Sequence, residues 1–103
     1  MKKILIIGAS TLQLPAIIKA KKLGLYVVVA DYDSNAVGKN YADEYYNVST
    51  VDIDGIVNLA KQVKPDGVMT LATDMPMRSV AAATTELGLP GISLETAIKA
   101  PDN

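Results

Sequence analysis

Short unbroken apolar runs alternate in this chain with segments whose apolar residues are spaced as on one face of a helix. Residues 4–7 and 26–30 are such runs, which are typical of strands buried on both faces of a sheet. Between them, Ile17, Ala20 and Leu23 fall on one helical face. The alternation predicts parallel strands joined by right-handed helical crossovers.

The pattern continues in the second half of the chain. Residues 45–48 and 67–71 are two further strand candidates, of which the first is the weaker. An amphipathic helix is predicted from the N-cap Asp52 to Pro65, and another over about 75–87. The side chains expected to face inward from the second of these helices are Met77, Val80, Ala81, Thr84 and Leu87. The sequence therefore predicts an α/β fold: an open, mostly parallel twisted sheet of about four to five strands with helices on both faces.

The composition excludes several classes of function. The 103 residues contain no Cys and no His, which excludes thiolate nucleophiles, Ser-His-Asp relays and nearly every zinc site. Ten basic and eleven acidic side chains give a net charge of −1, which does not favour nucleic acid as a partner. The apolar run at 4–7 is too short for a signal peptide, and no segment approaches the length of a membrane span. We therefore expect a soluble cytoplasmic protein that binds neither nucleic acid nor membrane.

Ligands of open α/β sheets bind outside the carboxyl ends of the strands, near the point where the strand order reverses. The first loop that this rule selects, residues 8–12, leaves the first strand and enters a helix. Free backbone N–H groups at a helix start attract an anion such as phosphate. We expect Gly8, Ala9, Ser10 and Thr11 to contact a substrate or anion there. The alternative interpretation is a tight turn that any α/β unit needs.

The same loop departs from the dinucleotide-binding fingerprint. The pattern G-x-G-x-x-G requires glycine at positions 8, 10 and 13, where the chain has Gly8, Ser10 and Gln13. The side chain of Ser10 is expected to limit the approach of a pyrophosphate, and Gln13 to loosen the packing of the helix on the strand. Only the first glycine is present, so the fingerprint does not favour a dinucleotide cofactor.

Two further loops carry candidate contact residues. Asp31 follows the second strand, where a dinucleotide-binding domain keeps the acid that binds a ribose hydroxyl, while Asp33 is equally a turn former. The loop after the fourth strand candidate carries Thr73, Asp74 and Arg78. A guanidinium can bind a phosphate or carboxylate through two parallel hydrogen bonds. The alternatives are a helix cap for Asp74 and a surface salt bridge for Arg78.

Several short segments, in this order along the chain, carry a family resemblance: Ile-Leu-Ile-Ile-Gly-Ala-Ser at 4–10, Lys-Leu-Gly at 22–24, Val-Val-Val-Ala-Asp at 27–31, Tyr-Ala-Asp-Glu at 41–44, Val-Asp at 51–52, Pro-Asp-Gly-Val at 65–68, Thr-Asp at 73–74 and Glu-Leu-Gly-Leu-Pro-Gly at 86–91. Together they resemble the N-terminal, or pre-ATP-grasp, domain of ATP-grasp ligases. This superfamily includes the carbamoyl-phosphate synthase large chain, biotin carboxylase and the phosphoribosylaminoimidazole carboxylase ATPase subunit. The resemblance covers essentially the whole chain.

The resemblance implies one Rossmann-like pre-ATP-grasp domain over residues 1–103, truncated before the ATP-grasp domain. In such ligases ATP phosphorylates a carboxylate or bicarbonate, and a nucleophile such as an amine then displaces phosphate from the acyl phosphate. ATP and magnesium would bind outside this segment, which would hold no cofactor, metal or catalytic residue and would form one wall of the substrate pocket. The implied partners are a small-molecule substrate and the downstream ATP-grasp domain, with a homodimer left open.

Purine-pathway members of the superfamily tend to carry a glycine-rich stretch after the first strand, and this chain has Ala9, Ser10 and Thr11 there. A phosphoribosyl substrate is therefore not favoured, and the third loop is more similar to carbamoyl-phosphate-synthase-like members. The alternative function is a free-standing NAD(P)- or nucleotide-binding Rossmann sensor or cofactor domain. Asp31 favours that alternative, whereas Ser10 and Gln13 disfavour it.

Overall fold

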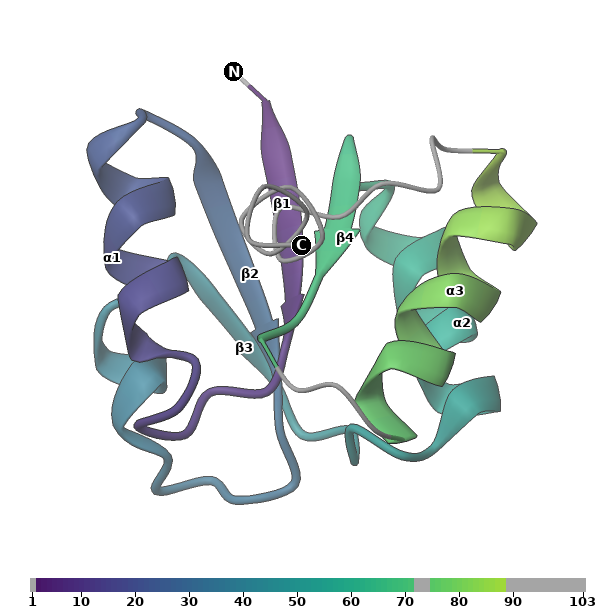
Figure 1. Ribbon diagram of the computed structural model, residues 1–103, viewed down its shortest axis with the longest axis horizontal. Coiled ribbons are helices and arrows are strands. Elements are labelled where there is room, and N and C mark those ends of the chain that lie inside the picture. Colours follow the sequence, from purple (N-terminus) through teal and green to yellow (C-terminus); the bar gives the residue numbers. More distant parts are fainter. Residues whose placement is uncertain (1, 72–74, 89–103) are drawn as a thin grey trace, which may run out of the picture.

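The computed structural model describes residues 2–71 and 75–88, and of residues 75–77 only the backbone. These residues form a parallel sheet flanked by helices (Figure 1). In chain order the elements are β1 (Lys3–Ile7), α1 (Leu14–Lys22), β2 (Tyr26–Ala30), the 3-10 helix η1 (Val37–Asn40), β3 (Glu44–Tyr46), α2 (Ile53–Val63), β4 (Gly67–Met69) and α3 (Met75–Leu87).

The described sheet has four strands in the order β3-β2-β1-β4, and each pair of neighbours is parallel. The register pairs Ile7 of β1 with Ala30 of β2, and Ile6 of β1 with Met69 of β4. The chain moves from β1 outward through β2 to β3 and then returns to the other side of β1, so the strand order reverses beside β1. The predicted α/β fold with a parallel sheet is confirmed.

Successive strand residues point to opposite faces of the sheet, and helices cover both faces. Ile6 and Val29 pack with Ile17 of α1 on one face, whereas Leu5 and Val28 pack against α2 and α3 on the other. Figure 1 shows α1 on one side of the strands and the pair α2 and α3 on the opposite side. Because both faces are buried, β1 and β2 consist almost entirely of apolar residues.

Local chemistry sets the helix boundaries. The side chain of Asp52 accepts a hydrogen bond of 3.0 Å from the Gly55 amide, which confirms the predicted N-cap of α2. Pro15 lies in the first turn of α1, where its missing N–H removes no helical hydrogen bond. Gly24 closes α1 with a φ of +79°, a left-handed conformation that glycine adopts without a steric penalty.

Several predicted details of the elements are wrong. Strand β3 covers residues 44–46 instead of 45–48, and β4 ends at Met69 because Thr70 and Leu71 turn toward β1 and α1. Leu23 is 58% exposed, since it follows the last turn of α1 instead of sharing its buried face. On α3, Ala81 is exposed and Ala83 is fully buried, because a run of three alanines carries no helical period.

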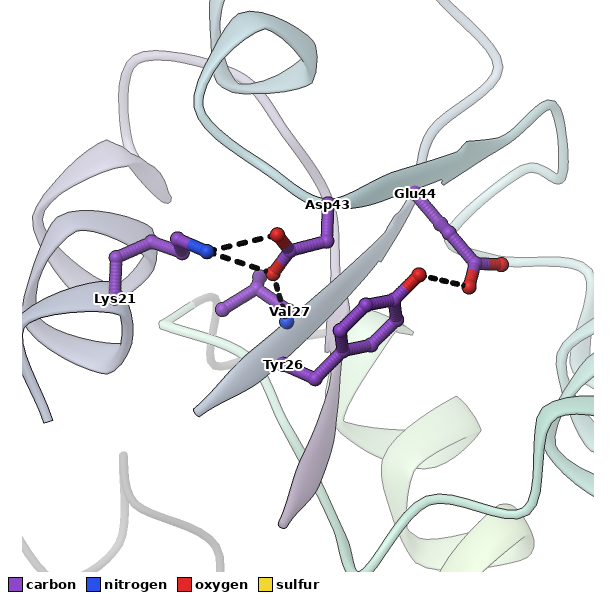
Figure 2. Close-up of polar contacts among 5 residues, drawn as sticks. All are labelled: Lys21, Tyr26, Val27, Asp43 and Glu44. Atoms are coloured by element: carbon purple, nitrogen blue, oxygen red, sulfur yellow. Dashed lines mark hydrogen bonds and ion pairs between the residues drawn. The ribbon is translucent and has the colours of Figure 1, made fainter. Parts of the chain in front are cut away.

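The amino-terminal edge of the sheet is held together by Asp43 (Figure 2). Its carboxylate accepts from Nζ of Lys21 at 2.8 Å and from the Val27 amide, also at 2.8 Å. The ion pair with Lys21, followed by the hydrogen bond from Val27, lowers the pKa of Asp43 below its usual value of 3.8. One acidic side chain therefore connects α1, β2 and the start of β3.

Glu44 makes a second set of contacts at this edge. Its two oxygens accept from the hydroxyls of Tyr26, at 2.5 Å, and Tyr46, at 2.6 Å. The hydrogen bond to Glu44, followed by burial and the carboxylate charge, raises the pKa of Tyr26 to about 12. The same bond, followed by that from Tyr46, lowers the pKa of Glu44 from 4.5. Figure 2 shows the Tyr26 side chain pointing to Glu44, away from the Lys21 ion pair.

These shifts predict a pH dependence of stability. A raised folded-state pKa of Tyr26 gives stability that is present below pH 10 and is lost as the pH rises toward about 12. We expect Tyr26→Phe to lower the urea midpoint of unfolding at pH 7. Above pH 10 the difference in midpoint between this variant and the parent chain, which is the gap to be measured, should shrink. Tyr32→Phe is the control, because the Tyr32 side chain is 71% exposed. A gap for Tyr26→Phe that stays constant from pH 7 to about 12 would contradict the prediction.

Candidate functional site

The loops that follow β1 and β2 meet at the carboxyl edge of the sheet, and Asp31 joins them. Asp31 is only 7% exposed, and its carboxylate accepts from the Ala9 amide at 2.9 Å and from the Asp33 amide at 3.0 Å. The hydroxyl of Tyr45 donates to the Asp31 carbonyl oxygen at 2.7 Å. Burial, followed by the charge of Asp31, raises the pKa of Tyr45 above 10.0 and keeps this hydroxyl a donor.

The turn between β1 and α1 presents unpaired backbone amides. Gly8 begins it with a φ of +106°, and a hydrogen bond of 2.9 Å from the Gln13 amide to the Ser10 carbonyl closes it. The amides of Ser10, Thr11 and Leu12 donate to no acceptor within residues 2–71 and 75–88. These N–H groups lie in the turn that precedes α1. Successive backbone N–H groups in such a turn can bind an anion.

The start of α1 is less available than the sequence suggests. The helix begins at Leu14, whose amide donates to the Thr11 carbonyl at 3.2 Å. The amides of Ala16 and Ile17 both donate to the Gln13 carbonyl, at 3.0 and 3.1 Å. The first turn of the helix is therefore bonded internally, and the donors open to a ligand are those of the preceding turn.

A cavity of about 270 Å³ opens beside this turn. Its polar lining consists of Gly8, Ser10, Gln13, Asp31, Asp33 and Thr50, and its apolar lining of Ile7, Leu12 and Tyr32. The turn contributes hydrogen-bond donors, whereas Asp31 and Asp33 contribute acceptors. A ligand that fits the cavity presents acceptor oxygens to the turn and a hydroxyl or amine to the carboxylates.

The structure brings together part of the predicted contact set. Gly8, Ser10 and Asp31 line the cavity, as a shared edge requires. Ala9 is buried and its amide is used by Asp31, so it supports the turn instead of facing the cavity. Thr11 is exposed and is not among the residues that line the cavity. Contact of these residues with a ligand remains a prediction.

Only part of the third predicted loop lies within the described residues. Thr73 and Asp74 lie outside the described residues. Arg78 is in the first turns of α3 with an exposed side chain, and it is not among the residues that line the cavity. Within the described ranges no cluster of three or more acidic side chains could hold a metal ion, and no helix there is long and apolar enough to cross a membrane.

Gln13 is the cavity residue that sequence reasoning assigned wrongly. Its side chain is 3% exposed, and its Oε1 accepts from the Leu71 amide at 2.9 Å. A Cβ added to Gly8 would come within 2.9 Å of Cγ of Gln13, so the glutamine fills the space beside that glycine. Instead of loosening the packing, Gln13 ties the loop after β1 to the segment after β4. The available signal was the departure from glycine itself, since a side chain at that position must occupy the space beside Gly8.

Comparison with known proteins identifies the family. The family model described as the ATP-grasp N-terminal domain matches residues 17–91. The chain belongs to the ATP-grasp N-terminal domain family. The resemblance inferred from the sequence is therefore confirmed, and with it the ATP-grasp, ligase-type relationship of the chain.

The relatives of this ATP-grasp N-terminal domain are much longer proteins. The formate-dependent phosphoribosylglycinamide formyltransferase of Prochlorococcus marinus is 34% identical over 68 residues, which are 66% of this chain and 17% of that protein. The crystal structure of phosphoribosylglycinamide synthetase from Anaerococcus prevotii has a TM-score of 0.80 and 30% identity, over 98% of this chain and 26% of that one. An ADP complex of N5-carboxyaminoimidazole ribonucleotide synthetase has a TM-score of 0.69 and 26% identity, over 82% of this chain and 22% of that one.

Proposed function

We propose that this chain is the substrate-side domain of an ATP-dependent carboxylate–amine or carbamoyl-phosphate-synthase-like ligase that works through an acyl phosphate. Residues 1–103 would form its pre-ATP-grasp domain, and ATP and magnesium would bind to an ATP-grasp domain beyond them. The membership of the family and the ADP bound to one longer relative support this proposal. A cytoplasmic location, with a small-molecule substrate and the ATP-grasp domain as partners, belongs to the same proposal.

The observation that carries the proposal is the turn of unpaired amides beside the buried Asp31. The amides of Ser10, Thr11 and Leu12 would bind a substrate oxyanion, because N–H dipoles fixed before binding need no reorganisation. Asp31, held by two amides, keeps spare lone pairs for a substrate hydroxyl or amine. These residues bind and orient the substrate; they transfer no proton and form no covalent bond. Orientation of the acceptor before phosphoryl transfer is their expected contribution to rate.

A nucleotide sensor or cofactor domain is the second candidate, favoured by an acid at the end of β2. Asp31 also holds the two loops together through the amides of Ala9 and Asp33, so its presence does not by itself indicate a ribose hydroxyl. Gln13 occupies the space where the dinucleotide fingerprint places its third glycine. Ser10 stands where the second glycine of the fingerprint lets a pyrophosphate approach the backbone, so the cavity favours a single small oxyanion over a pyrophosphate.

Calorimetric titration of the purified chain with NAD and NADP separates the two candidates. We expect no binding in the micromolar range and no ATP hydrolysis by the chain alone, because the proposed function places nucleotide chemistry in another domain. Micromolar binding of either dinucleotide would favour the second candidate, and ATP turnover in a pure preparation would contradict the proposed function. Sequencing of the gene beyond codon 103 provides the independent check: the ligase requires a downstream region with a Lys and paired acidic residues.

A further inference from the structure

We infer that Gln13 determines the ligand specificity of the cavity, by donating a hydrogen bond from Nε2 of its side chain to an oxyanion of the ligand. The chemical class of that ligand group is a phosphate or carboxylate oxygen. The inference rests on the proposed function only in taking the cavity as a ligand site. It assigns the residue that decides which ligands enter.

The orientation of the Gln13 side-chain amide follows from its partner. The Leu71 amide approaches it at 2.9 Å, and an N–H group can donate only to an acceptor. The oxygen of the side chain must therefore face Leu71. The nitrogen lies beside Gly8, where an added Cβ would be 3.4 Å from Nε2. Both Gly8 and Gln13 line the cavity, and we place the free nitrogen toward its interior.

Among the residues that the structure describes, the Gln13 nitrogen is a buried donor without an acceptor. Gln13 is only 3% exposed. Neither N–H of Nε2 donates to an acceptor in the ranges 2–71 and 75–88. Buried polar groups are almost always hydrogen-bonded, and the exceptions call for a partner such as a water or ligand. A ligand oxygen in the cavity would satisfy this donor.

The neighbouring groups have the same polarity. The free amides of Ser10, Thr11 and Leu12 lie in the turn that Gln13 closes, and the Ser10 side chain also lines the cavity. Because donors on this side outnumber acceptors, a negatively charged oxygen is a better ligand than a hydroxyl or an amine. Gln13 adds the donor that is most deeply buried.

The size of Gln13 adds a steric selection. The methylene groups of its side chain fill the space beside Gly8, which a glycine at position 13 would leave open. In the dinucleotide fingerprint the second glycine, at position 10, lets the backbone approach the pyrophosphate, and this chain has Ser10 there. Ser10 and Gln13 together narrow the turn, which favours a single oxyanion over the bridged diphosphate of a dinucleotide.

Nuclear magnetic resonance of the 15N-labelled chain tests this inference directly. Inorganic phosphate and formate are titrated separately at constant ionic strength, with sodium chloride as the reference salt. We expect the side-chain NH2 signals of Gln13 to shift saturably with at least one probe, together with the amides of residues 10–12. The probe that shifts them distinguishes a phosphate group from a carboxylate. The side-chain signals of Gln62, which is exposed on α2, are the internal reference.

Gln13→Glu is the decisive variant, because it keeps an acceptor for the Leu71 amide and replaces the donor by a second acceptor. We expect at least a tenfold weaker affinity for the probe at pH 7.5, and an unchanged affinity for Gln62→Glu, which adds the same charge far from the cavity. If Gln13→Glu does not fold, Gln13→Met takes its place. Methionine is similar in volume to glutamine and has no hydrogen-bond donor, so this variant is also expected to weaken binding.

The outcomes separate this inference from the proposed function. If the amides of residues 10–12 shift and the Gln13 NH2 does not, Gln13 is not the donor, while the anion-binding turn stands. If neither probe moves the Gln13 NH2 or the turn, both the inference and the anion site are wrong. If Gln13 responds and the chain also binds NAD in the micromolar range, the donor role of Gln13 stands, its selection against a diphosphate is wrong, and the ligase proposal fails.

Discussion

Gly38→Ala should destabilise the fold by about 2–3 kcal/mol, the cost of forcing an extra methyl group into a packed site. An added Cβ would lie 2.6 Å from the Ala9 carbonyl oxygen and 2.5 Å from Cδ1 of Ile17. The same Ala9 oxygen accepts from the Gly38 amide at 2.7 Å, so the two backbones cannot separate without breaking this hydrogen bond. Because Ala9 belongs to the turn that bears the free amides, the variant should also disturb the candidate site.

Urea unfolding measures this effect, and Gly67→Ala is its matched control. A Cβ at Gly67 would meet nothing within 4 Å, so that variant should change stability by less than about 0.5 kcal/mol. Equal midpoints for the two variants would mean that η1 moves away from Ala9 at no cost. If the NMR spectrum of Gly38→Ala is native-like and only the signals of residues 8–12 shift, η1 has moved away from Ala9 with a smaller loss of stability than expected.

The parts of the fold that the sequence predicted are those with a strong hydrophobic period. β1 and β2 are buried on both faces and appear as unbroken apolar runs, and α2 combines an apolar face with an N-cap at Asp52. The short helix η1 has no such period in its four residues and was not predicted. The sequence-based prediction misplaced the ends of β3 and β4, because contacts with other segments decide where these strands stop, and the apolar pattern does not show those contacts.

The candidate site divides in the same way. Parallel strands end at one edge of a sheet, so the meeting of Gly8 and Asp31 followed from the strand assignment alone. The role of Gln13 did not, because it depends on the Leu71 amide, 58 residues away in the chain. A pattern search treats Gln13 as a missing glycine, whereas the structure makes it a link between two loops. The acid segment at 43–44 is likewise explained only by its contacts with α1 and β2.

Asp31→Ala should cost about 3 kcal/mol, because two amides lose a charged acceptor in a site with little access to water. The hydrogen bond from Tyr45 to the Asp31 backbone carbonyl survives the substitution, so the end of β2 should remain paired. Asp31→Asn keeps one oxygen for one of the two amides and should lose about half as much. Asp33→Ala is the control: within the described residues the carboxylate of this exposed aspartate accepts only from the Asn35 amide, and the loss should stay within about 0.5 kcal/mol.

Phosphate titration of Asp31→Ala distinguishes a positioning role from a purely electrostatic one. If Asp31 acted on an anion only through its negative charge, removal of that charge would tighten phosphate binding. Because its carboxylate instead fixes the Ala9 amide at 2.9 Å, and thereby the turn that carries the free N–H groups, we expect binding to weaken although the cavity becomes less negative. Tighter binding in Asp31→Ala would show that the turn holds its shape without Asp31. The carboxylate would then act on the ligand alone, as a group that selects against anions.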